Sequence, residues 1–299
     1  MVELRGRAVL VTGAGRGLGR AYALDAAAAG ASVLVNDVDR DVAEAVAAEI
    51  VAAGGRAEVS DHSVDDPVAV TAMVDAAIAA FGALDGIVVN AGLYHEAVPW
   101  EEEPQAVARD IGVNVLGGLY CVTAAARVMA PRRRGAIVIA SSAGALGSRR
   151  IMTYAASKGA LTALTVSAAI DLAEHGVRVN AIAPVALTRM TGDAIGRNIV
   201  AAGRSTALLA ELDQRRPEAV APLVSYLLSD DAAGVTGQFL RFDGQRLAVF
   251  PQASLPDLPG LTADGWTRDE IAAAFAGPLA GLLQRFGVES MAPDAAAHP

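Results

Sequence analysis

The stretch TGAGRGLG, residues 12–19, decides how this chain folds. An apolar run at residues 8–11 precedes it, and a run of helix-forming residues at 21–29 follows it. A glycine-rich turn in this position lets backbone amides approach a pyrophosphate at the N-terminus of a helix. The order of strand, turn and helix favours a dinucleotide-binding turn over a merely tight connection.

Short runs rich in valine, isoleucine and alanine alternate along the chain with longer alanine-rich segments of helical composition. This alternation is typical of a parallel sheet covered by helices on both faces. We predict strands at residues 8–12, 32–36, 57–60, 86–90, 136–140, 178–182 and 238–242. We predict helices between them at residues 18–29, 41–53, 67–81, 105–129, 153–174 and 217–229. The expected fold class is therefore α/β, a doubly wound, seven-stranded parallel sheet of the Rossmann type with helices on both faces.

Two segments do not follow this alternation. Glycines interrupt residues 189–216, which we interpret as an insertion that covers a substrate. Prolines and polar residues follow position 250, and residues 267–286 then have the pattern of one more helix before a flexible tail. We predict a single domain over residues 1–250 that includes the catalytic site, with residues 251–299 as its C-terminal extension.

Composition excludes several classes of function. The 299 residues are 53% hydrophobic and 19% charged, which is enough apolar surface for a large core. The net charge of −9 disfavours binding to nucleic acid. The longest uncharged run found, residues 111–126, is shorter than a membrane span, so we expect no membrane insertion. The single cysteine, Cys121, cannot form an internal disulfide, and no apolar targeting segment precedes the first strand, so we expect a cytoplasmic protein.

Asp37 and Arg16 give opposing indications about the nucleotide. Asp37 ends the second predicted strand, 18 residues after Gly19, close to the spacing at which a carboxylate binds the adenosine ribose hydroxyls. That carboxylate would repel a 2′-phosphate and favours NAD, whereas Arg16 could attract the phosphate and would favour NADP. We predict NAD because Asp37 would contact the ribose directly, with NADP as the alternative. Asp61, after the third strand, is a candidate for the adenine edge or an ordinary turn residue.

Tyr154 and Lys158 are four residues apart at the start of a predicted helix, so they lie on one face of it. A free tyrosine, with a pKa near ~10, is a poor base at neutral pH, and a nearby ammonium stabilises its phenolate. We therefore expect Lys158 to lower the pKa of Tyr154. A surface packing pair is the alternative for this spacing taken alone.

Polar residues near the carboxyl edge of the sheet complete the candidate site. Ser141 directly follows the fifth strand and precedes Tyr154 by 13 residues, so its hydroxyl could hold a substrate oxygen, with Ser142 as the competing candidate. Asn114 lies in an otherwise apolar helix, where it either anchors a water that relays protons from Lys158 or is a satisfied core amide. The histidines show no spacing that converges on a metal, so no metal site is predicted and we interpret His62, His95, His175 and His298 as surface or loop residues.

Taken together, these residues resemble the short-chain dehydrogenase/reductase superfamily over residues 5–249. The matching elements are the glycine turn, Asn90-Ala91-Gly92 after the fourth strand, Asn114, Ser141, Tyr154-Ala155-Ala156-Ser157-Lys158, and residues 180–184. The resemblance implies a catalytic set of Asn114, Ser141, Tyr154 and Lys158. It implies cofactor contacts from Gly13, Arg16, Gly17, Leu18, Gly19, Asp37, Asp61, His62, Asn90, Ala91, Gly92, Tyr154, Lys158, Pro184 and Thr188.

The segments TGAGRGLGRAYAL, VNDV, IAPVALTRMT and PEAVAPLV look most like the (3R)-hydroxyacyl-CoA dehydrogenase unit of peroxisomal multifunctional enzymes. The implied activity is hydride transfer between a nicotinamide cofactor and a small-molecule secondary alcohol or ketone, with a 3-hydroxyacyl thioester as one candidate. The alternatives are an NADPH-dependent biosynthetic ketoreductase and a non-catalytic dinucleotide sensor. The resemblance also implies a homodimer or homotetramer formed through the helices that contain Asn114 and Tyr154.

Overall fold

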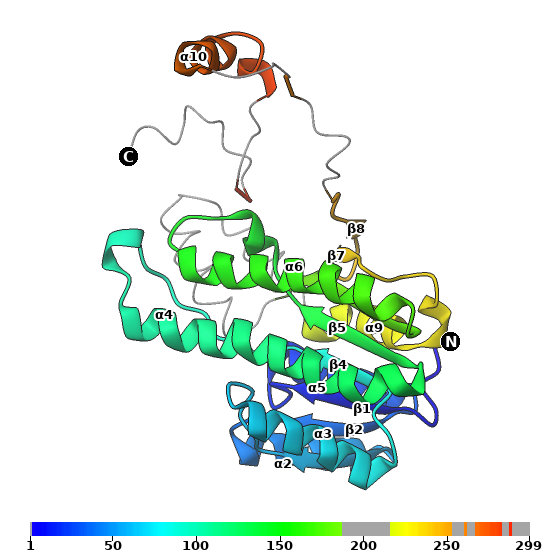
Figure 1. The fold of residues 1–299 in the computed structure, drawn as a ribbon. Coiled ribbons are helices and arrows are strands. Elements are labelled where there is room, and N and C mark those ends of the chain that lie inside the picture. The colour runs from blue at the N-terminus through cyan, green and yellow to red at the C-terminus, as the bar shows by residue number, and fades with distance from the viewer. Residues whose placement is uncertain (1, 187–215, 253–259, 262–266, 283–286, 289–299) are drawn as a thin grey trace.

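The chain folds around one eight-stranded sheet, seen in the computed structural model, which describes residues 2–186, 216–252, 260–261, 267–282 and 287–288 (Figure 1). The strand order is β3-β2-β1-β4-β5-β6-β7-β8. The strands are β1 (Ala8–Thr12), β2 (Ser32–Asn36), β3 (Arg56–Ser60), β4 (Gly86–Val89), β5 (Gly135–Ala140), β6 (Val177–Pro184), β7 (Phe239–Phe242) and β8 (Leu247–Val249). The predicted doubly wound sheet and all seven of its strands are confirmed. β8 is an additional strand, antiparallel to β7.

Burial explains why the central strands are almost entirely apolar. Every residue of β1, β4 and β5 is buried, because helices cover both faces of the sheet at its centre. β3 alternates exposed and partly buried residues up to Ser60, as expected for a strand at the edge of the sheet.

Helices cover the two faces in two groups. One hydrophobic core joins the sheet to α1 (Gly17–Ala28), α2 (Arg40–Ala52) and α9 (Pro217–Leu228). The other joins it to α3 (Pro67–Phe81), α5 (Gly117–Arg132) and α6 (Met152–Ala173). The strand order reverses between β1 and β4, so the loops at their carboxyl ends diverge and leave room for a ligand.

The long helix predicted at residues 105–129 is divided into three segments. α4 (Pro104–Ile111) leads into a π-helical turn, η2 (Gly112–Leu116), and then into α5. The whole run Pro104–Arg132 has the length and mean hydropathy of a membrane span. It contains the buried and hydrogen-bonded Asp110 and Asn114, and α5 packs against the sheet, as a core helix of a globular protein does. Single π turns are frequent at functional sites, and this one carries Asn114.

In the described part of the C-terminal region, the helix predicted to begin at residue 267 ends at Ala276. α10 (Arg268–Ala276) begins at a capping box formed by Thr267 and Glu270, and a short 3₁₀ turn, Ala280–Leu282, follows it. The backbone N–H of Val288 donates to the carbonyl oxygen of Gly147, 2.8 Å away, so the extension contacts the loop after β5. Apart from Arg216, which precedes α9, the insertion predicted at 189–216 lies outside the described residues. The domain boundary at position 250 stays a prediction.

Candidate active site

The glycine turn connects β1 to α1 and is held in place by Asn90. Gly13 has a φ of 62°, in the left-handed region that favours glycine. A side chain at Gly19 would come within 2.0 Å of the carbonyl oxygen of Gly13, so only glycine fits there. Asn90, directly after β4, donates from Nδ2 to the carbonyl oxygens of Thr12 (3.0 Å) and Gly13 (3.1 Å). The Thr12 hydroxyl accepts from the backbone N–H groups of Asn90 and Ala91, which links the two strand ends.

The N-terminus of α1 is suited to bind a phosphate group. The helix begins at Gly17, and Arg16 at the N-cap makes no side-chain capping hydrogen bond. The first N–H groups of a helix have no partner within the helix, and the helix dipole makes this end favourable for an anion. The predicted contacts Gly17, Leu18 and Gly19 supply these donors, so the turn fits the pyrophosphate of a dinucleotide.

Two carboxylates, those of Asp37 and Asp39, lie beside the glycine turn. Asp37 accepts hydrogen bonds from the backbone N–H groups of Gly15 (3.0 Å) and Asp39 (3.1 Å), which fixes its carboxylate beside the glycine turn. Arg16 is held by Asp39, 2.7 Å from its Oδ2 atom, an ion pair that the sequence did not suggest. Asp37 and Arg16 gave opposing indications about the nucleotide. In the structure, backbone N–H groups hold the Asp37 carboxylate, and Arg16 is paired with the Asp39 carboxylate.

The remaining predicted cofactor contacts lie at or near the same edge of the sheet. Asp61 pairs with Arg40 (3.3 Å), and the carbonyl oxygen of His62 accepts from Asn36 (2.9 Å). Pro184 is the last residue of β6. Gly92 lies where a side chain would contact both Asn114 and Lys158. Thr188 lies outside the described residues.

The structure brings Tyr154 and Lys158 together at the start of α6, as their spacing predicts. Lys158 is only 4% exposed, and its Nζ atom donates to the carbonyl oxygen of Ala140 at the end of β5, 2.8 Å away. The same atom lies 5.5 Å from the centre of the Tyr154 ring. The ammonium is therefore fixed between the carboxyl edge of the sheet and the phenol.

The pKa of Tyr154 is raised in the structure, whereas Lys158 was expected to lower it. Burial is the largest cause acting on Tyr154 and raises the pKa of its phenol, while a side-chain hydrogen bond with Ser142 acts in the opposite direction. Burial also lowers the pKa of Lys158 from 10.5 to about 8. The expected lowering of the Tyr154 pKa by Lys158 is thus not found, because desolvation disfavours both charged forms.

The two adjacent serines have different partners. The hydroxyl of Ser141 donates to the carbonyl oxygen of Lys158 (2.9 Å) and also contacts Thr162 (3.0 Å), so it faces the body of α6. The hydroxyl of Ser142 hydrogen-bonds Tyr154 and accepts from the backbone N–H of Gly144 (3.0 Å). Of the two serines considered for holding the substrate oxygen, the first choice, Ser141, therefore faces α6, and the competing candidate, Ser142, lies beside the phenol. The chain bends at the end of β5, where the N–H of Ser141 donates to the carbonyl oxygen of Ile139 (3.0 Å).

Asn114 is fully hydrogen-bonded. Its Nδ2 donates to the carbonyl oxygen of Leu93 (2.9 Å) and to the Ser157 hydroxyl (3.0 Å), and its Oδ1 accepts from the backbone N–H of Leu93 (2.7 Å). Of the two interpretations that the sequence left open, these contacts favour the satisfied amide. Asn114 thereby attaches the segment after β4 to α6, on which Tyr154 and Lys158 lie.

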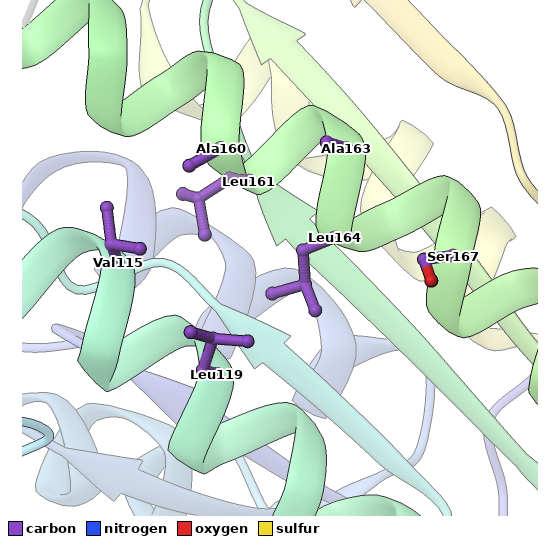
Figure 2. Close-up of a pocket in the computed structure, with 7 residues that line it drawn as sticks. All are labelled: Val115, Leu119, Ala160, Leu161, Ala163, Leu164 and Ser167. Atoms are coloured by element: carbon purple, nitrogen blue, oxygen red, sulfur yellow. The ribbon is translucent and has the colours of Figure 1, made fainter.

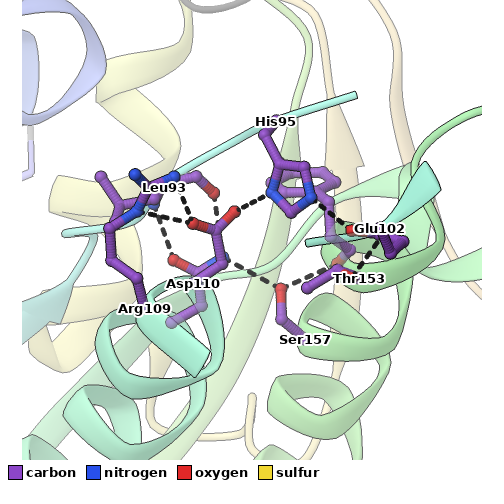
Figure 3. Close-up of polar contacts among 9 residues, drawn as sticks. Leu93, His95, Glu102, Arg109, Asp110, Thr153 and Ser157 are labelled. Atoms are coloured by element: carbon purple, nitrogen blue, oxygen red, sulfur yellow. Dashed lines mark hydrogen bonds and ion pairs between the residues drawn. The ribbon is translucent and has the colours of Figure 1, made fainter. Parts of the chain in front are cut away.

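A cluster of charged groups beside Tyr154 was not predicted from the sequence. His95 lies between Asp110 and Glu102, Arg109 contacts Asp110, and Glu102 accepts from Thr153, the residue before Tyr154 (Figure 3). His95 does lie in a loop, as the sequence interpretation has it, but its side chain is largely buried and paired with two carboxylates, which that interpretation did not include. Its partners come from positions 102 and 110 in separate elements, and no sequence spacing signals their convergence.

Comparison with known proteins identifies the family. A family model described as enoyl-(acyl carrier protein) reductase matches residues 13–244. A short-chain dehydrogenase from Mycobacterium avium, of known structure, is 32% identical and superimposes with a TM-score of 0.80 over 97% of both chains. This chain belongs to the short-chain dehydrogenase/reductase family. The resemblance inferred from the sequence is confirmed at that level.

Two further relatives show what members of this family do. Cis-4-hydroxycyclohexanecarboxylate dehydrogenase of Sinomonas cyclohexanicum is 38% identical over 59% of this chain and 71% of its own length. A 7α-hydroxysteroid dehydrogenase complexed with NADH and a 7-oxo bile acid is 31% identical, with a TM-score of 0.72 over 82% of this chain and 95% of that chain. This short-chain dehydrogenase/reductase is therefore an oxidoreductase that transfers hydride between a nicotinamide cofactor and an alcohol or ketone.

Proposed function

We propose that the protein is an NAD(H)-dependent dehydrogenase of secondary alcohols and the corresponding ketones, with Tyr154 as its acid/base. The observation that carries this proposal is the Tyr154 phenol, which is hydrogen-bonded to Ser142 and lies beside the buried Lys158 ammonium. All three residues lie at the carboxyl end of β5, where Ser142 follows the strand and Lys158 bonds the carbonyl oxygen of Ala140. A dinucleotide sensor would not require this arrangement of an acid, a hydroxyl and a cation.

Each residue has a distinct role in the proposed proton transfer. A bound nicotinamide supplies or accepts the hydride. Tyr154 takes the hydroxyl proton of an alcohol, or returns a proton to the oxygen of a ketone. Ser142 donates a hydrogen bond to that oxygen and holds it near the phenol. The Lys158 ammonium does not offset the burial that raises the pKa of Tyr154, but it is the cation that lies beside any negative charge formed on the phenol during proton transfer. Asn114 keeps the loop after β4 attached to α6 and is a positioning residue.

The two serines provide a matched test of the proposed site. With NAD(H) and a panel of cyclic secondary alcohols, hydroxysteroids and 3-hydroxyacyl thioesters, we expect turnover of at least one class. Ser142→Ala should lower kcat by about 100-fold, as loss of a donor to the reacting oxygen does. Ser141→Ala should leave kcat within about threefold, since its hydroxyl binds α6 and its loss affects stability by about 1 kcal/mol. Equal losses in the two variants would contradict the assignment of Ser142.

The preference for NAD rests on the charges beside the glycine turn. Asp37 and Asp39 present two carboxylates beside the glycine turn, where we expect the adenosine ribose and any 2′-phosphate to bind, and Asp39 pairs with Arg16. Repulsion from both carboxylates would oppose NADP, and Arg16 would have to leave its ion pair to bind it. An NADPH-dependent ketoreductase is therefore the less favoured alternative.

We expect NAD to bind more tightly than NADP, and Asp37→Ala to narrow the ratio of the two dissociation constants by about tenfold. The variant removes both a ribose acceptor and a repulsive charge. Titrations at fixed ionic strength measure this, with Asp37→Asn as the control that keeps an oxygen for the N–H of Gly15. Equal or tighter NADP binding by the unchanged protein would show that Arg16 outweighs Asp37.

The substrate class is inferred in part from relatives. One relative is named for a hydroxycyclohexane carboxylate and the other for the 7α-hydroxyl of a steroid, so each name describes a secondary alcohol on a ring. The Tyr94 ring packs edge-on against Tyr154, with centroids 4.9 Å apart, and gives this side of the site an aromatic wall suited to a hydrocarbon ring. We therefore place cyclic secondary alcohols ahead of 3-hydroxyacyl thioesters, the class that the finer resemblance to the peroxisomal dehydrogenase unit suggested.

We also propose a homodimer or homotetramer formed through α5 and α6. An apolar groove of about 360 Å³ lies between α6 and the run formed by η2 and α5, lined by Val115, Leu119, Ala160, Leu161, Ala163, Leu164 and Ser167 (Figure 2). Leu116 and Leu119 are also about two-fifths exposed. A second copy of the same helix pair would cover this surface without burying a charge. Sedimentation analysis tests the assignment, and a monomer at micromolar concentration would contradict it.

A cytoplasmic location is the last element of the proposal. Cys121 is buried in α5, and burial raises its pKa to about 12, so its thiol is unreactive. A chain with one such thiol needs no oxidising compartment. Cell fractionation tests the location.

A further inference from the structure

The His95 side chain lies between two carboxylates that come from different elements. Its Nδ1 atom is 2.6 Å from Oδ2 of Asp110, and its Nε2 atom is 2.7 Å from Oε2 of Glu102 (Figure 3). The Asp110 side chain is fully buried, and those of Glu102 and His95 are 7% and 18% exposed. Both ring nitrogens are thus in short contact with acceptors that water barely reaches.

This geometry specifies the protonation state of the ring. A neutral imidazole has one N–H and one lone pair, so it can donate to only one of the two carboxylates and would direct its lone pair at the other. Only the imidazolium satisfies both. The charged groups facing it are Glu102 from its own segment and Asp110 from α4, with Arg109 on the second oxygen of Asp110. α6 contributes the neutral Thr153. The hydrogen bonds with Glu102 and Asp110 raise the pKa of His95 above its usual 6.5.

Three contacts connect this cluster to the catalytic tyrosine. Tyr94, the residue before His95, packs its ring at 76° to that of Tyr154. Glu102 accepts a hydrogen bond of 2.8 Å from the hydroxyl of Thr153, the residue before Tyr154. Between them, the N–H of Ala97 donates to the carbonyl oxygen of Arg150 (2.9 Å), just before α6. The segment at residues 93–102 therefore contacts the start of α6 at three points. His95 also links this segment to α4 through Asp110.

We propose that His95 is a positioning residue for Tyr154, holding the segment at residues 93–102 against α6 only while its imidazole is doubly protonated. The inference rests on the proposed role of Tyr154 as acid/base. Loss of the proton turns one of the two nitrogen–carboxylate contacts repulsive, so either the link to Asp110 or the link to Glu102 must open. In both cases the Tyr94 ring is no longer fixed against Tyr154. Because the folded-state pKa is raised, the link is complete below pH 6.5 and is lost as the pH rises through that raised value.

Hydrogen exchange tests the positioning without any substrate. His95→Gln keeps a similar size but can donate to only one carboxylate, and His175→Gln, at the exposed C-terminal end of α6, is the matched control. At pH 6 we expect amide exchange in peptides covering residues 93–102 to rise about tenfold in His95→Gln and to stay unchanged in His175→Gln. Equal exchange in the two variants overturns the proposal. Because this measurement needs no turnover, it decides the inference even if the proposed activity is wrong.

Kinetics separate positioning from a general loss of structure. We expect His95→Gln to lower kcat by about 10- to 100-fold, because a small displacement of a catalytic group has that effect, and to leave the NAD dissociation constant unchanged. For alcohol oxidation, the wild-type pH profile of kcat should have a descending alkaline limb that His95→Gln lacks and His175→Gln retains. If the descending limb persists in His95→Gln, it belongs to another group, such as Lys158, and the proposal is overturned. An unchanged kcat in His95→Gln overturns it as well.

Discussion

Tyr154→Phe is expected to abolish turnover while leaving the dissociation constant for NAD nearly unchanged. The substitution removes only the phenolic oxygen that transfers the proton, and the remaining ring still packs against Tyr94. A positioned general acid or base contributes about 10²- to 10⁴-fold to a rate, so kcat should fall by at least the lower figure. Initial rates with saturating NAD and the best substrate of the panel, together with a cofactor titration, measure both quantities.

Tyr226→Phe is the matched control for this substitution. Among the described residues, its hydroxyl donates a long, exposed hydrogen bond of 3.4 Å to the carbonyl oxygen of Asp231. The control should keep full activity. If Tyr154→Phe retained more than about a tenth of the wild-type rate, the loss would be too small for a general acid or base, and the proposed role of Tyr154 would be wrong.

Most of the fold could be predicted because each buried strand has a strong local signal. β1 and β5 are almost entirely apolar runs flanked by glycine or polar residues. Their predicted ends agree with the structure to within one residue. β8 was missed because Leu247–Val249 is only three residues long and pairs with β7 through tertiary context. The π turn at Asn114 was missed for a related reason, since its apolar neighbours have the same composition as those of an ordinary helix.

The parts of the site that sequence could not assign depend on side-chain direction and long-range contacts. Spacing placed a serine near Tyr154 but could not choose between Ser141 and Ser142, because only the bend of the chain after β5 decides which hydroxyl faces the phenol. The His95 cluster joins residues 7 and 15 positions apart, and no periodicity relates them. The electrostatic expectation for Tyr154 and Lys158 failed because a four-residue spacing predicts proximity and says nothing about desolvation.

That desolvation implies that Lys158 is retained at the expense of stability. Burial lowers the pKa of Lys158 from 10.5 to about 8. This difference corresponds to about 3 kcal/mol of unfavourable free energy for the charged form in the folded state. Below pH 8 the lysine is charged in both the folded and the unfolded protein, so the whole penalty applies. Between pH 8 and 10.5 the folded state releases its proton first, and the penalty declines to zero.

Lys158→Met should therefore stabilise the protein near neutral pH while removing its activity. Methionine has a similar length and needs no hydration, although it gives up the hydrogen bond to the carbonyl oxygen of Ala140, which for a charged donor is worth about 2 kcal/mol. We expect the free energy of unfolding at pH 7 to rise by about 1 kcal/mol, the balance of these two effects. Urea denaturation at several pH values measures this gain, which should shrink as the pH rises from 8 towards 10.5 because the wild-type penalty disappears there.

The same variant should lose at least about 100-fold in kcat, because no cation then lies beside the negative charge that forms on Tyr154 during proton transfer. NAD binding should also weaken if Lys158 contacts the nicotinamide ribose as the family resemblance implies. A variant that is inactive yet more stable at pH 7 shows that the activity was not lost through unfolding. A variant less stable than wild type at pH 7 would instead mean that the ammonium is well solvated or paired in the folded protein, contrary to its burial beside Ala140.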